Sequence, residues 1–434
     1  MKAIINTLIY DYNTFIENGY CIFDKDIIEV GPMEDFKVKH MKFQGEVING
    51  DGKMLLPGLV NFHTHIYSTL VRGASIPFNP KSFKDILEQL WWRFDAQLDK
   101  ESIYSSALVY GIESIKNGVT TLIDHHASGL SIGNSLDILK EAVTKELGMR
   151  GIFCFETSDR FDLKECISEN IRGLHWDDAD AKGMFGLHAS MSLSESSLND
   201  IMTFVEENPI HIHVAESHED EIDCVRNYGE RVVNRLCAKG LLNKDSILAH
   251  CVHIDEEEAK LIQTHDAYVA VNPTSNMNNA VGSYNFELLN KNNIGILVGT
   301  DGLGANVAKE WQSLYYAGKA HMRNPVGISF DEMLNYINGS YEYLSRQFGI
   351  RIGKIAGAYA ADLILVDYKA PTEINEDNAF GHVFYGLFDN LRPSHVWIKG
   401  KLLLNGYISI FEEDEIYSHA REESKKLWNR IGVK

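Results

Sequence analysis

Hydrophobic positions in the middle of this 434-residue chain fall into short runs separated by stretches with helical spacing. Apolar runs of four to eight residues, bounded by polar turns, are typical of buried strands. The predicted strands are 55–62, 120–124, 151–155, 184–187, 210–214, 246–249, 267–271 and 294–299. Between them, apolar residues recur every three or four positions, as at Ile103, Ala107, Ile112 and Ile115 before the helix-ending Gly118.

Eight short strands that alternate with helices favour one architecture, an α/β fold in which a parallel (β/α)8 TIM-like barrel is surrounded by its helices. The structural alternative is a doubly wound open sheet. That fold usually carries a Gly-x-Gly-x-x-Gly turn after a strand, and no predicted strand here is followed by one.

The two ends of the chain have a different pattern from the middle. Short apolar runs with turn signals predict strands at 15–23 and 27–32, and again at 362–367, 395–400 and 401–406. We therefore expect a small composite β-sandwich domain from residues 1–56 and 357–434, and a barrel from residues 57–356. A charged stretch with helical spacing, 412–429, predicts a final helix.

Composition narrows the function classes. The chain is 44% hydrophobic and 24% charged, which is ordinary for a globular protein, and its formal net charge is −20. Such an acidic balance argues against binding to nucleic acid or to anionic membranes. The start turns polar too early for a secretory signal, no apolar run reaches the ~18 residues of a membrane helix, and the six cysteines form no Cys-x-x-Cys pair. We expect a cytoplasmic location.

The predicted strand ends carry the chemistry, because the active site of a barrel lies at the carboxyl ends of its strands. The first strand closes with His63-Thr64-His65, and residues two apart on a strand point to the same side. Two imidazoles can thus reach one metal ion. Taken alone, the pair is equally well explained by structural histidines.

Later strand ends add further groups of the same kind: His213 and Glu216, then His250, and then Asp301. Three imidazoles and a carboxylate around an open position suit a catalytic Zn²⁺ or Fe²⁺. Such an ion lowers the pKa of a water molecule towards neutrality and makes it a nucleophile. We therefore predict a metal-dependent hydrolase.

The motifs at these strand ends resemble the amidohydrolase superfamily, in its deaminase and chlorohydrolase branch. The resemblance rests on Pro57-Gly58-Leu59-Val60-Asn61-Phe62-His63-Thr64-His65, His213-Val214-Ala215-Glu216, Ala249-His250-Cys251-Val252-His253 and Gly299-Thr300-Asp301-Gly302. A closer resemblance, to the SsnA-type aminohydrolases associated with purine and selenium metabolism, rests on residues 90–93, 123–128, 154–160 and 275–279.

The resemblance implies a role for each matching residue. The metal ligands would be His63, His65, His213 and Asp301. Asp301 would also take a proton from the attacking water, Glu216 would carry a proton to a ring nitrogen of the substrate, and His250 would hydrogen-bond the water.

The resemblance also bears on the number of metal ions. Two-metal members usually need a carboxylated lysine at the end of strand four, where this chain has His188. We therefore expect one divalent ion, Zn²⁺ with Fe²⁺ as the alternative.

The resemblance and the loop positions also suggest substrate contacts. Each has a structural alternative, since histidines and tryptophans often simply pack in a core. The predicted substrate-binding residues are His188, Arg72, His125, His126, Trp92 and Asn276. His211 lies two residues before His213, and we expect it one layer deeper in the barrel.

Two loops depart from the family pattern and put the substrate in doubt. Many deaminases of this branch carry Ser-Asn-Asn after the Thr-Asp-Gly motif, where this chain has 303–307, Leu-Gly-Ala-Asn-Val, and residues 72–80 lack the pattern of nucleoside deaminases.

The leading prediction is hydrolysis of a non-peptide C–N bond, by deamination of a purine-like or other planar N-heterocycle. The alternatives are ring opening of a cyclic amide, chlorohydrolase-type displacement and, remotely, a non-catalytic scaffold. The expected partner is a small heterocyclic substrate, and the resemblance implies a homodimer.

Overall fold

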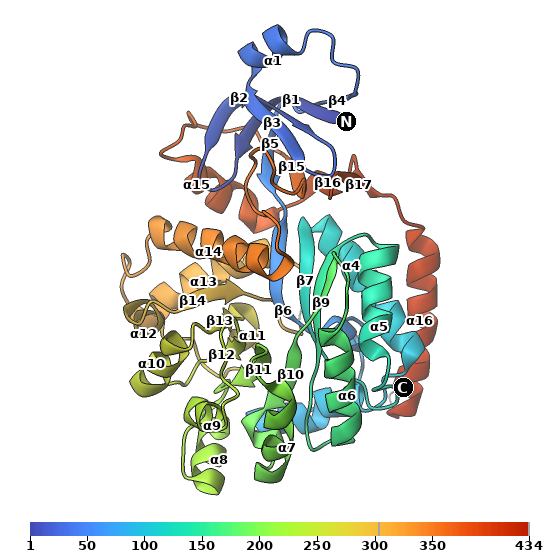
Figure 1. Cartoon of the computed structure of the whole chain (residues 1–434), viewed down its shortest axis with the longest axis vertical. Helices are drawn as coiled ribbons and strands as arrows, with labels where there is room; N and C mark the ends of the chain where they lie inside the picture. The colour runs from blue at the N-terminus through green and yellow to red at the C-terminus, as the bar shows by residue number, and fades with distance from the viewer. Residues whose placement is uncertain (303, 433–434) are drawn as a thin grey trace.

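The computed structural model describes residues 1–302 and 304–432, and eight parallel strands form its central barrel (Figure 1). The barrel strands are β6 (Leu59–Thr64), β7 (Val119–His126), β8 (Arg150–Phe155), β10 (Phe185–Ala189), β11 (Ile210–Val214), β12 (Ile247–His250), β13 (Tyr268–Val271) and β14 (Gly295–Val298). Two ladders, β6-β7-β8 and β10 to β14, are joined by bridges between Thr64 and Asp301 and between Thr157 and Leu187. The eight predicted strands are confirmed, with small shifts in their ends.

One predicted strand, 55–62, is divided between two sheets. Its first part is β5 (Lys53–Pro57), which belongs to the terminal sheet, and its second part is β6 in the barrel. The break falls at Gly58, where a Cβ atom would lie only 2.3 Å from the Thr120 side chain. A short strand that we did not predict, β9 (Ala181–Gly183), extends the β8 edge.

Helices surround the barrel as predicted (Figure 1). They are α4 (Lys100–Lys116), α5 (Ser135–Lys140), η3 (Glu141–Glu146), α6 (Leu163–Leu174), α7 (Glu195–Val205), α8 (His218–Tyr228), α9 (Val232–Ala238), α10 (Glu256–Thr264), α11 (Pro273–Asn278), α12 (Phe286–Lys291), α13 (Val307–Met322) and α14 (Phe330–Phe348). The start of α4 is typical: Asp99 and Ser102 form a capping box, and Gly118 follows the helix with a φ of 76°.

A long connection between β6 and α4 covers the carboxyl end of the barrel and consists of short helical turns. These are η1 (Ile66–Val71), α2 (Phe83–Ile86), η2 (Leu87–Trp91) and α3 (Trp92–Asp95), and a further turn, η4 (Ser190–Ser192), follows β10. The η2 segment is a π-helix, a geometry that is often found at functional sites.

The two termini build one nine-stranded sheet above the barrel (Figure 1). Its strands are β1 (Lys2–Tyr10), β2 (Phe15–Phe23), β3 (Ile27–Pro32), β4 (Glu46–Asn49), β5, β15 (Leu363–Asp367), β16 (Pro393–Ile398), β17 (Lys401–Asn405) and β18 (Ile408–Ser409). Short helices accompany them: α1 (Met33–Lys39), α15 (Ala379–His382), η5 (Val383–Leu387) and η6 (Phe388–Asn390). A buried ion pair between Arg150 and Asp362 joins this sheet to the barrel.

The last helix, α16 (Glu413–Arg430), runs beside the barrel and packs against α4 and η1 (Figure 1). Its Trp428 Nε1 donates a hydrogen bond of 2.7 Å to the Leu70 carbonyl. Within the described residues, every helix is too short or too polar to cross a membrane.

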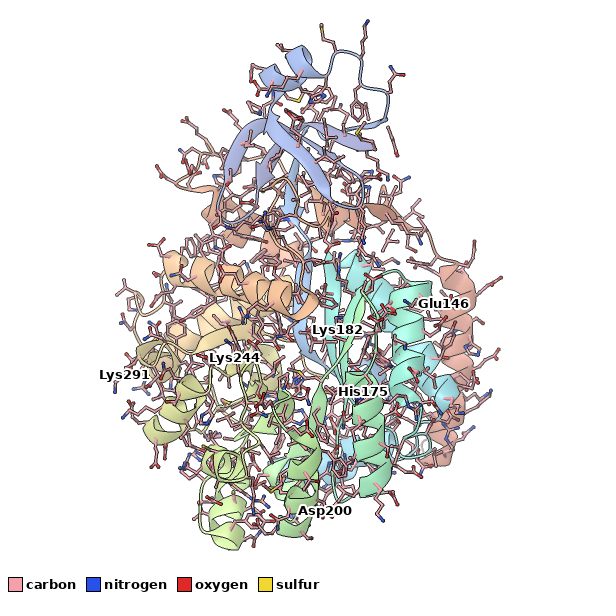
Figure 2. The ribbon with its side chains drawn as sticks, in the orientation of Figure 1. Glu146, His175, Lys182, Asp200, Lys244 and Lys291 are labelled. Atoms are coloured by element: carbon pink, nitrogen blue, oxygen red, sulfur yellow. The ribbon has the colours of Figure 1, made fainter. Side chains whose placement is uncertain are left out.

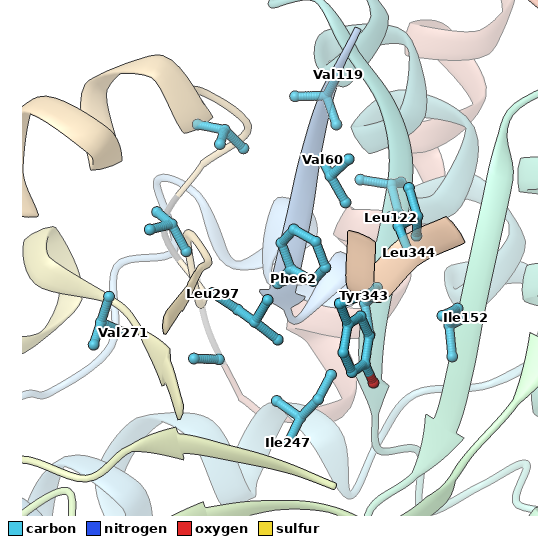
Figure 3. Packing of buried hydrophobic residues seen from close by; sticks show 14 of the residues in the cluster. Val60, Phe62, Val119, Leu122, Ile152, Ile247, Val271, Leu297, Tyr343 and Leu344 are labelled. Carbon is cyan, nitrogen blue, oxygen red and sulfur yellow. The ribbon is translucent and has the colours of Figure 1, made fainter. Parts of the chain in front are cut away.

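A continuous hydrophobic core fills the space between the strands and their helices. Figure 3 shows Phe62 of β6 packed against Tyr343 of α14, with ring centroids 5.9 Å apart in an edge-to-face arrangement. Barrel residues such as Val60, Leu122 and Ile247 belong to the same buried cluster. This packing fixes the strands, and therefore the positions of the residues at their ends.

Candidate metal centre and active site

The predicted metal-binding side chains meet at the carboxyl end of the barrel. His63 ends β6 with His65 just after it, His213 lies in β11, and Asp301 follows β14. All three imidazoles are buried. In a parallel barrel the strand ends lie on one rim, so residues that are far apart in sequence converge there.

Two of the imidazoles face each other in one defined orientation. His65 Nδ1 donates a hydrogen bond of 2.7 Å to the His125 carbonyl, and His213 Nδ1 donates one of 2.9 Å to the His188 carbonyl. Both Nε2 atoms are therefore free to act as ligands, and they lie 3.2 Å apart. Tetrahedral zinc ligands at ~2.05 Å from the ion are about 3.3 Å from one another. The spacing fits two ligands of one ion.

A third nitrogen and one carboxylate oxygen complete the group. His63 Nδ1 hydrogen-bonds His211 Nε2 at 2.9 Å, and His63 Nε2 is buried without a hydrogen-bond partner among the described residues. Asp301 Oδ1 lies 3.5 Å from His63 Nε2 and 3.1 Å from His65 Nε2. The other oxygen, Oδ2, accepts a hydrogen bond from the Ser275 hydroxyl.

The protonation states of these side chains favour the binding of a cation. Burial lowers the pKa of His63 to about 3 and the pKa of His213 well below its ordinary value, so both are neutral ligands. Although burial opposes both shifts, contact with His63 and His65 holds the pKa of the Asp301 carboxyl well below its usual range, and contact with Asp301 raises the pKa of His65 to about 9. In the absence of an ion His65 therefore carries a proton near neutral pH, which a bound cation would displace. The ionised Asp301 thus attracts positive charge to the centre.

Glu216 and His250 stand beside these ligands. The Asn276 side-chain oxygen lies 2.8 Å from His250 Nδ1 and accepts a hydrogen bond from it, so His250 Nε2 is left for other contacts. That Nε2 lies 3.5 Å from Glu216 Oε2, and Asn279 Nδ2 lies 3.4 Å from Glu216 Oε1. Burial raises the pKa of Glu216 to about 7, which suits a group that gives and takes a proton near neutral pH.

Several residues at this centre have a strained backbone conformation, which fixes the direction of their side chains. Ala215, His250, Cys251 and Asp301 have φ values of 46°, 74°, 51° and 53°, a region that side-chain-bearing residues rarely adopt. Hydrogen bonds compensate, such as Asp301 N to the His63 carbonyl at 2.9 Å and Cys251 N to the Val214 carbonyl at 2.9 Å. Such strain at the rim of a barrel is characteristic of functional sites.

A cavity of about 640 Å³, counted to its open mouth, lies over the centre. This volume includes space that is open to solvent, and the space inside the cavity that admits the centre of a water-sized sphere is about 60 Å³. One wall is apolar, and the wall near the metal ligands is polar. The cavity is lined by His65, Tyr67, Phe83, Leu87, Trp91, Trp92, Asp95, Glu156, His188, Ala189, Met191, His213, Glu216, Asp220, Asn279, Asp301 and Gly302.

The structure brings only some of the predicted substrate contacts to this cavity. His188 and Trp92 line it, with their rings edge-to-face at 6.1 Å. Arg72 does not reach it: its side chain is 55% exposed and forms a bidentate ion pair with Glu113 at 2.8 and 2.9 Å. The prediction failed to anticipate that the loop after β6 turns Arg72 outward along α4.

The remaining predicted contacts lie behind the cavity wall. His125 is buried, and its Nε2 donates to the Leu187 and His211 carbonyls at 3.0 and 3.1 Å. His126 is buried against Ser128 Oγ at 3.0 Å, and Asn276 supports His250. His211 lies behind His63, one layer deeper, as we expected.

Sequence reasoning missed several groups in the wall, of which Glu156 is the most notable. It follows β8, so the rule that singled out the other strand ends would also have found it. Its carboxylate contacts His65, His125, His188 and Arg160. Ser275, which holds Asp301, was also missed, because only tertiary contacts reveal that pairing.

A second possible ligand group, formed by His65, His125, Glu156 and His213, shares two residues with the first. In this group the Nδ1 atoms of His65 and His213 already donate to carbonyls, and so does His125 Nε2. Lys182, which precedes strand four, lies on β9 and donates to the Asp178 carbonyl at 3.0 Å (Figure 2).

Comparison with known proteins agrees with this geometry. Residues 54–403 match the family described as the Amidohydrolase family. A 5-methylthioadenosine/S-adenosylhomocysteine deaminase of Syntrophomonas wolfei is 28% identical over 431 residues, 96% of each chain. A 5'-deoxyadenosine deaminase of Methanococcus maripaludis is 30% identical over 413 residues, 89% of this chain and 92% of its own.

Solved structures share the fold. An adenosine deaminase from Xanthomonas campestris with bound zinc superposes with a TM-score of 0.83 over 98% of both chains, at 22% identity. The zinc complex of the atrazine chlorohydrolase TrzN from Arthrobacter aurescens gives 0.79 over 99% of this chain and 100% of its own, at 19% identity. From the matched span and the ligand geometry together, this chain belongs to the amidohydrolase family.

Proposed function

We propose that this chain is a zinc-dependent deaminase of an adenine nucleoside. In this reaction the oxygen of a water molecule bonds to the ring carbon that carries the amino group, the C–N bond breaks, and the nitrogen leaves as ammonia. The observation that carries the proposal is the convergence of His65 Nε2, His213 Nε2 and Asp301 Oδ1 beside Glu216, at the base of an open cavity. The curated relatives, both deaminases of adenine nucleosides by name, support the choice of substrate.

His63, His65, His213 and Asp301 would hold the ion. Zinc, when bound there, would lower the pKa of a water molecule enough for it to act as a nucleophile at neutral pH. We propose one ion, because the second ligand group shares His65 and His213 with the first, and the Nδ1 atom of each of these imidazoles already donates to a carbonyl.

The protein side chains then account for the proton transfers. Asp301, held by Ser275, and His250, held by Asn276, lie where they can orient the attacking water and accept its proton. Glu216, with its pKa raised to about 7, can deliver a proton to a ring nitrogen, which makes the attacked carbon more electrophilic. The planar ring would lie between the aromatic side chains of Trp91, Trp92 and Phe83, which line the cavity.

The finer resemblance, to SsnA-type aminohydrolases of purine metabolism, stays a prediction. The same side chains could also open a cyclic amide or displace another leaving group. Product mass distinguishes these reactions, because deamination replaces a nitrogen by an oxygen, whereas ring opening adds water and keeps every nitrogen.

The test is to incubate zinc-loaded protein with adenosine, 5'-deoxyadenosine and 5-methylthioadenosine and to measure ammonia and product mass. We expect ammonia from at least one of them, and its loss in Glu216→Gln. The matched control is Glu165→Gln, the same change at an exposed position of α6. Zinc-loaded protein that releases no ammonia from any adenine compound would contradict the proposal.

A further inference from the structure

The cavity over the metal centre is lined by carboxylates. Five acidic residues line it, Asp95, Glu156, Glu216, Asp220 and Asp301, and the described lining residues include neither lysine nor arginine. A divalent ion brings two positive charges to this cavity of five carboxyl groups, of which Glu216 and Asp220 are partly protonated at neutral pH because burial raises the pKa of each to about 7. The cavity is therefore a region of negative potential, and its walls have low polarisability, which strengthens charge effects.

Glu156 is the buried carboxylate in the wall near His188. It is 2% exposed, and its Oε1 lies 3.2 Å from His125 Nδ1 and 3.3 Å from His65 Nδ1. Its Oε2 lies 3.9 Å from His188 Nε2. The carboxylate thus lies among three imidazoles, and the guanidinium that contacts it is that of Arg160.

The guanidinium of Arg160 does not neutralise both carboxylates of this part of the cavity wall. Arg160 is shared between two buried carboxylates, with Nη1 at 2.7 Å from Asp95 Oδ2 and Nη2 at 3.5 Å from Glu156 Oε2. Burial raises the pKa of Asp95 to about 6, so the Asp95 carboxyl is mostly ionised at neutral pH. Two negative charges thus face one positive charge, and Asp95 Oδ1 is buried without a hydrogen-bond partner among the described residues.

We propose that Glu156 and Asp95 form an anionic wall that determines specificity, admitting neutral or cationic substrates and excluding anionic ones. The inference rests on the proposed deaminase function and narrows it: among adenine nucleosides, the cavity takes those with a short uncharged 5' group and rejects 5'-phosphates and 5'-carboxylates. The apolar wall formed by Phe83, Leu87 and Met191 fits an uncharged substituent.

The groove outside the cavity offers no alternative site for an anion. It adjoins the cavity at Phe83, Trp91 and Asn279, which line both. The described residues that line the groove include one lysine, Lys81, and one carboxylate, Glu219. A substrate phosphate that reached out of the cavity would therefore find no excess of positive charge there.

The experiment compares kcat/KM of the zinc-loaded enzyme for 5'-deoxyadenosine, adenosine, adenosine 5'-monophosphate and adenosine-5'-carboxylate. Two like unit charges about 6 Å apart, at an effective dielectric constant of about 20, repel by an amount equivalent to roughly 100-fold in a rate constant. We expect both anionic compounds to fall below the neutral ones by at least that factor. Comparable rates for neutral and anionic compounds, within about 3-fold, would overturn the inference and leave the deaminase function intact.

Variants test the residues themselves. Glu156→Gln should raise the ratio of kcat/KM for anionic substrates to kcat/KM for neutral substrates by roughly 10-fold or more, because it removes a nearby negative charge. Glu165→Gln, which changes the net charge equally but on the surface, should leave the ratio unchanged. Because Glu156 contacts His65, zinc content is measured for each variant, and Asp95→Asn provides the same test without that contact. An unchanged ratio in a zinc-replete Glu156→Gln or Asp95→Asn would refute the wall's role.

Discussion

Replacement of Asn276 by alanine tests how the active-site histidine is oriented. Asn276 is buried in α11, and its Oδ1 lies 2.8 Å from His250 Nδ1. The other polar group near that nitrogen is the Asn272 amide nitrogen at 3.5 Å, which already donates to the Ala270 carbonyl. In Asn276→Ala the His250 Nδ1–H loses its acceptor, so the other tautomer becomes favourable and Nε2 would present a proton towards Glu216.

The size of the effect follows from the burial of His250. A buried donor left without a partner costs about 1–3 kcal/mol, and each ~1.4 kcal/mol corresponds to a factor of 10 in rate. We therefore expect kcat to fall by roughly 5- to 150-fold, a range that overlaps the 10- to 100-fold losses typical when a hydrogen-bond partner of a metal-binding histidine is removed. KM should change by less than about 3-fold, because Asn276 does not line the cavity.

The assay is steady-state ammonia release with zinc content measured in parallel. Asn278→Ala is the matched control, since Asn278 lies in the same helix but is exposed. A zinc-replete Asn276→Ala enzyme with kcat within about 2-fold of the parent would refute this account of His250 orientation.

Three further predictions concern catalysis, metal and pH. Glu216→Gln should lower kcat by roughly 10²- to 10⁴-fold, the usual contribution of a positioned proton donor, while zinc stays bound. Removal of metal by a chelator should lower Tm, and added zinc should restore it, because an ion that binds only the folded state stabilises it. Burial raises the pKa of Glu310 to about 7, so the folded protein binds an extra proton between about pH 4.5 and 7. Stability should therefore decline by up to ~3 kcal/mol as the pH rises through that window, and Glu310→Gln should flatten the decline.

Each of these has a clear contrary result. Full activity in Glu216→Gln would assign the proton transfer to another group. A Tm that is the same with chelator and with zinc would mean that the His63, His65 and His213 group does not bind the ion. For Glu310, a decline of equal slope in parent and variant, measured by denaturant unfolding at several pH values, would assign the pH dependence to other buried acids.

The sequence predicted most of the barrel because its strands are short apolar runs whose meaning depends little on context. The metal-binding residues could be predicted for a related reason: His63, His65, His213 and Asp301 all lie at or just after strand ends, and parallel topology alone brings strand ends together.

The substrate wall could not be predicted in the same way, since it is formed by the connection between β6 and α4. Arg72 was expected there and instead pairs with Glu113, because the course of a long loop depends on its tertiary contacts. His125 was expected to face the substrate, but β7 extends far enough for its imidazole to lie behind the wall. The limits of the composite domain and the homodimer stay predictions.

The Arg150–Asp362 ion pair has a consequence for how this protein is made. Arg150 opens the third barrel strand, whereas Asp362 comes some two hundred residues later and also binds the backbone N–H of Lys399 at 2.8 Å. Until Asp362, about five sixths of the way along the chain, has left the ribosome, the Arg150 guanidinium has no anionic partner for its buried position, and a buried charge without its partner is strongly destabilising. Nascent chains that stop before residue 362 should therefore remain sensitive to protease, and the barrel should close only after synthesis is nearly complete.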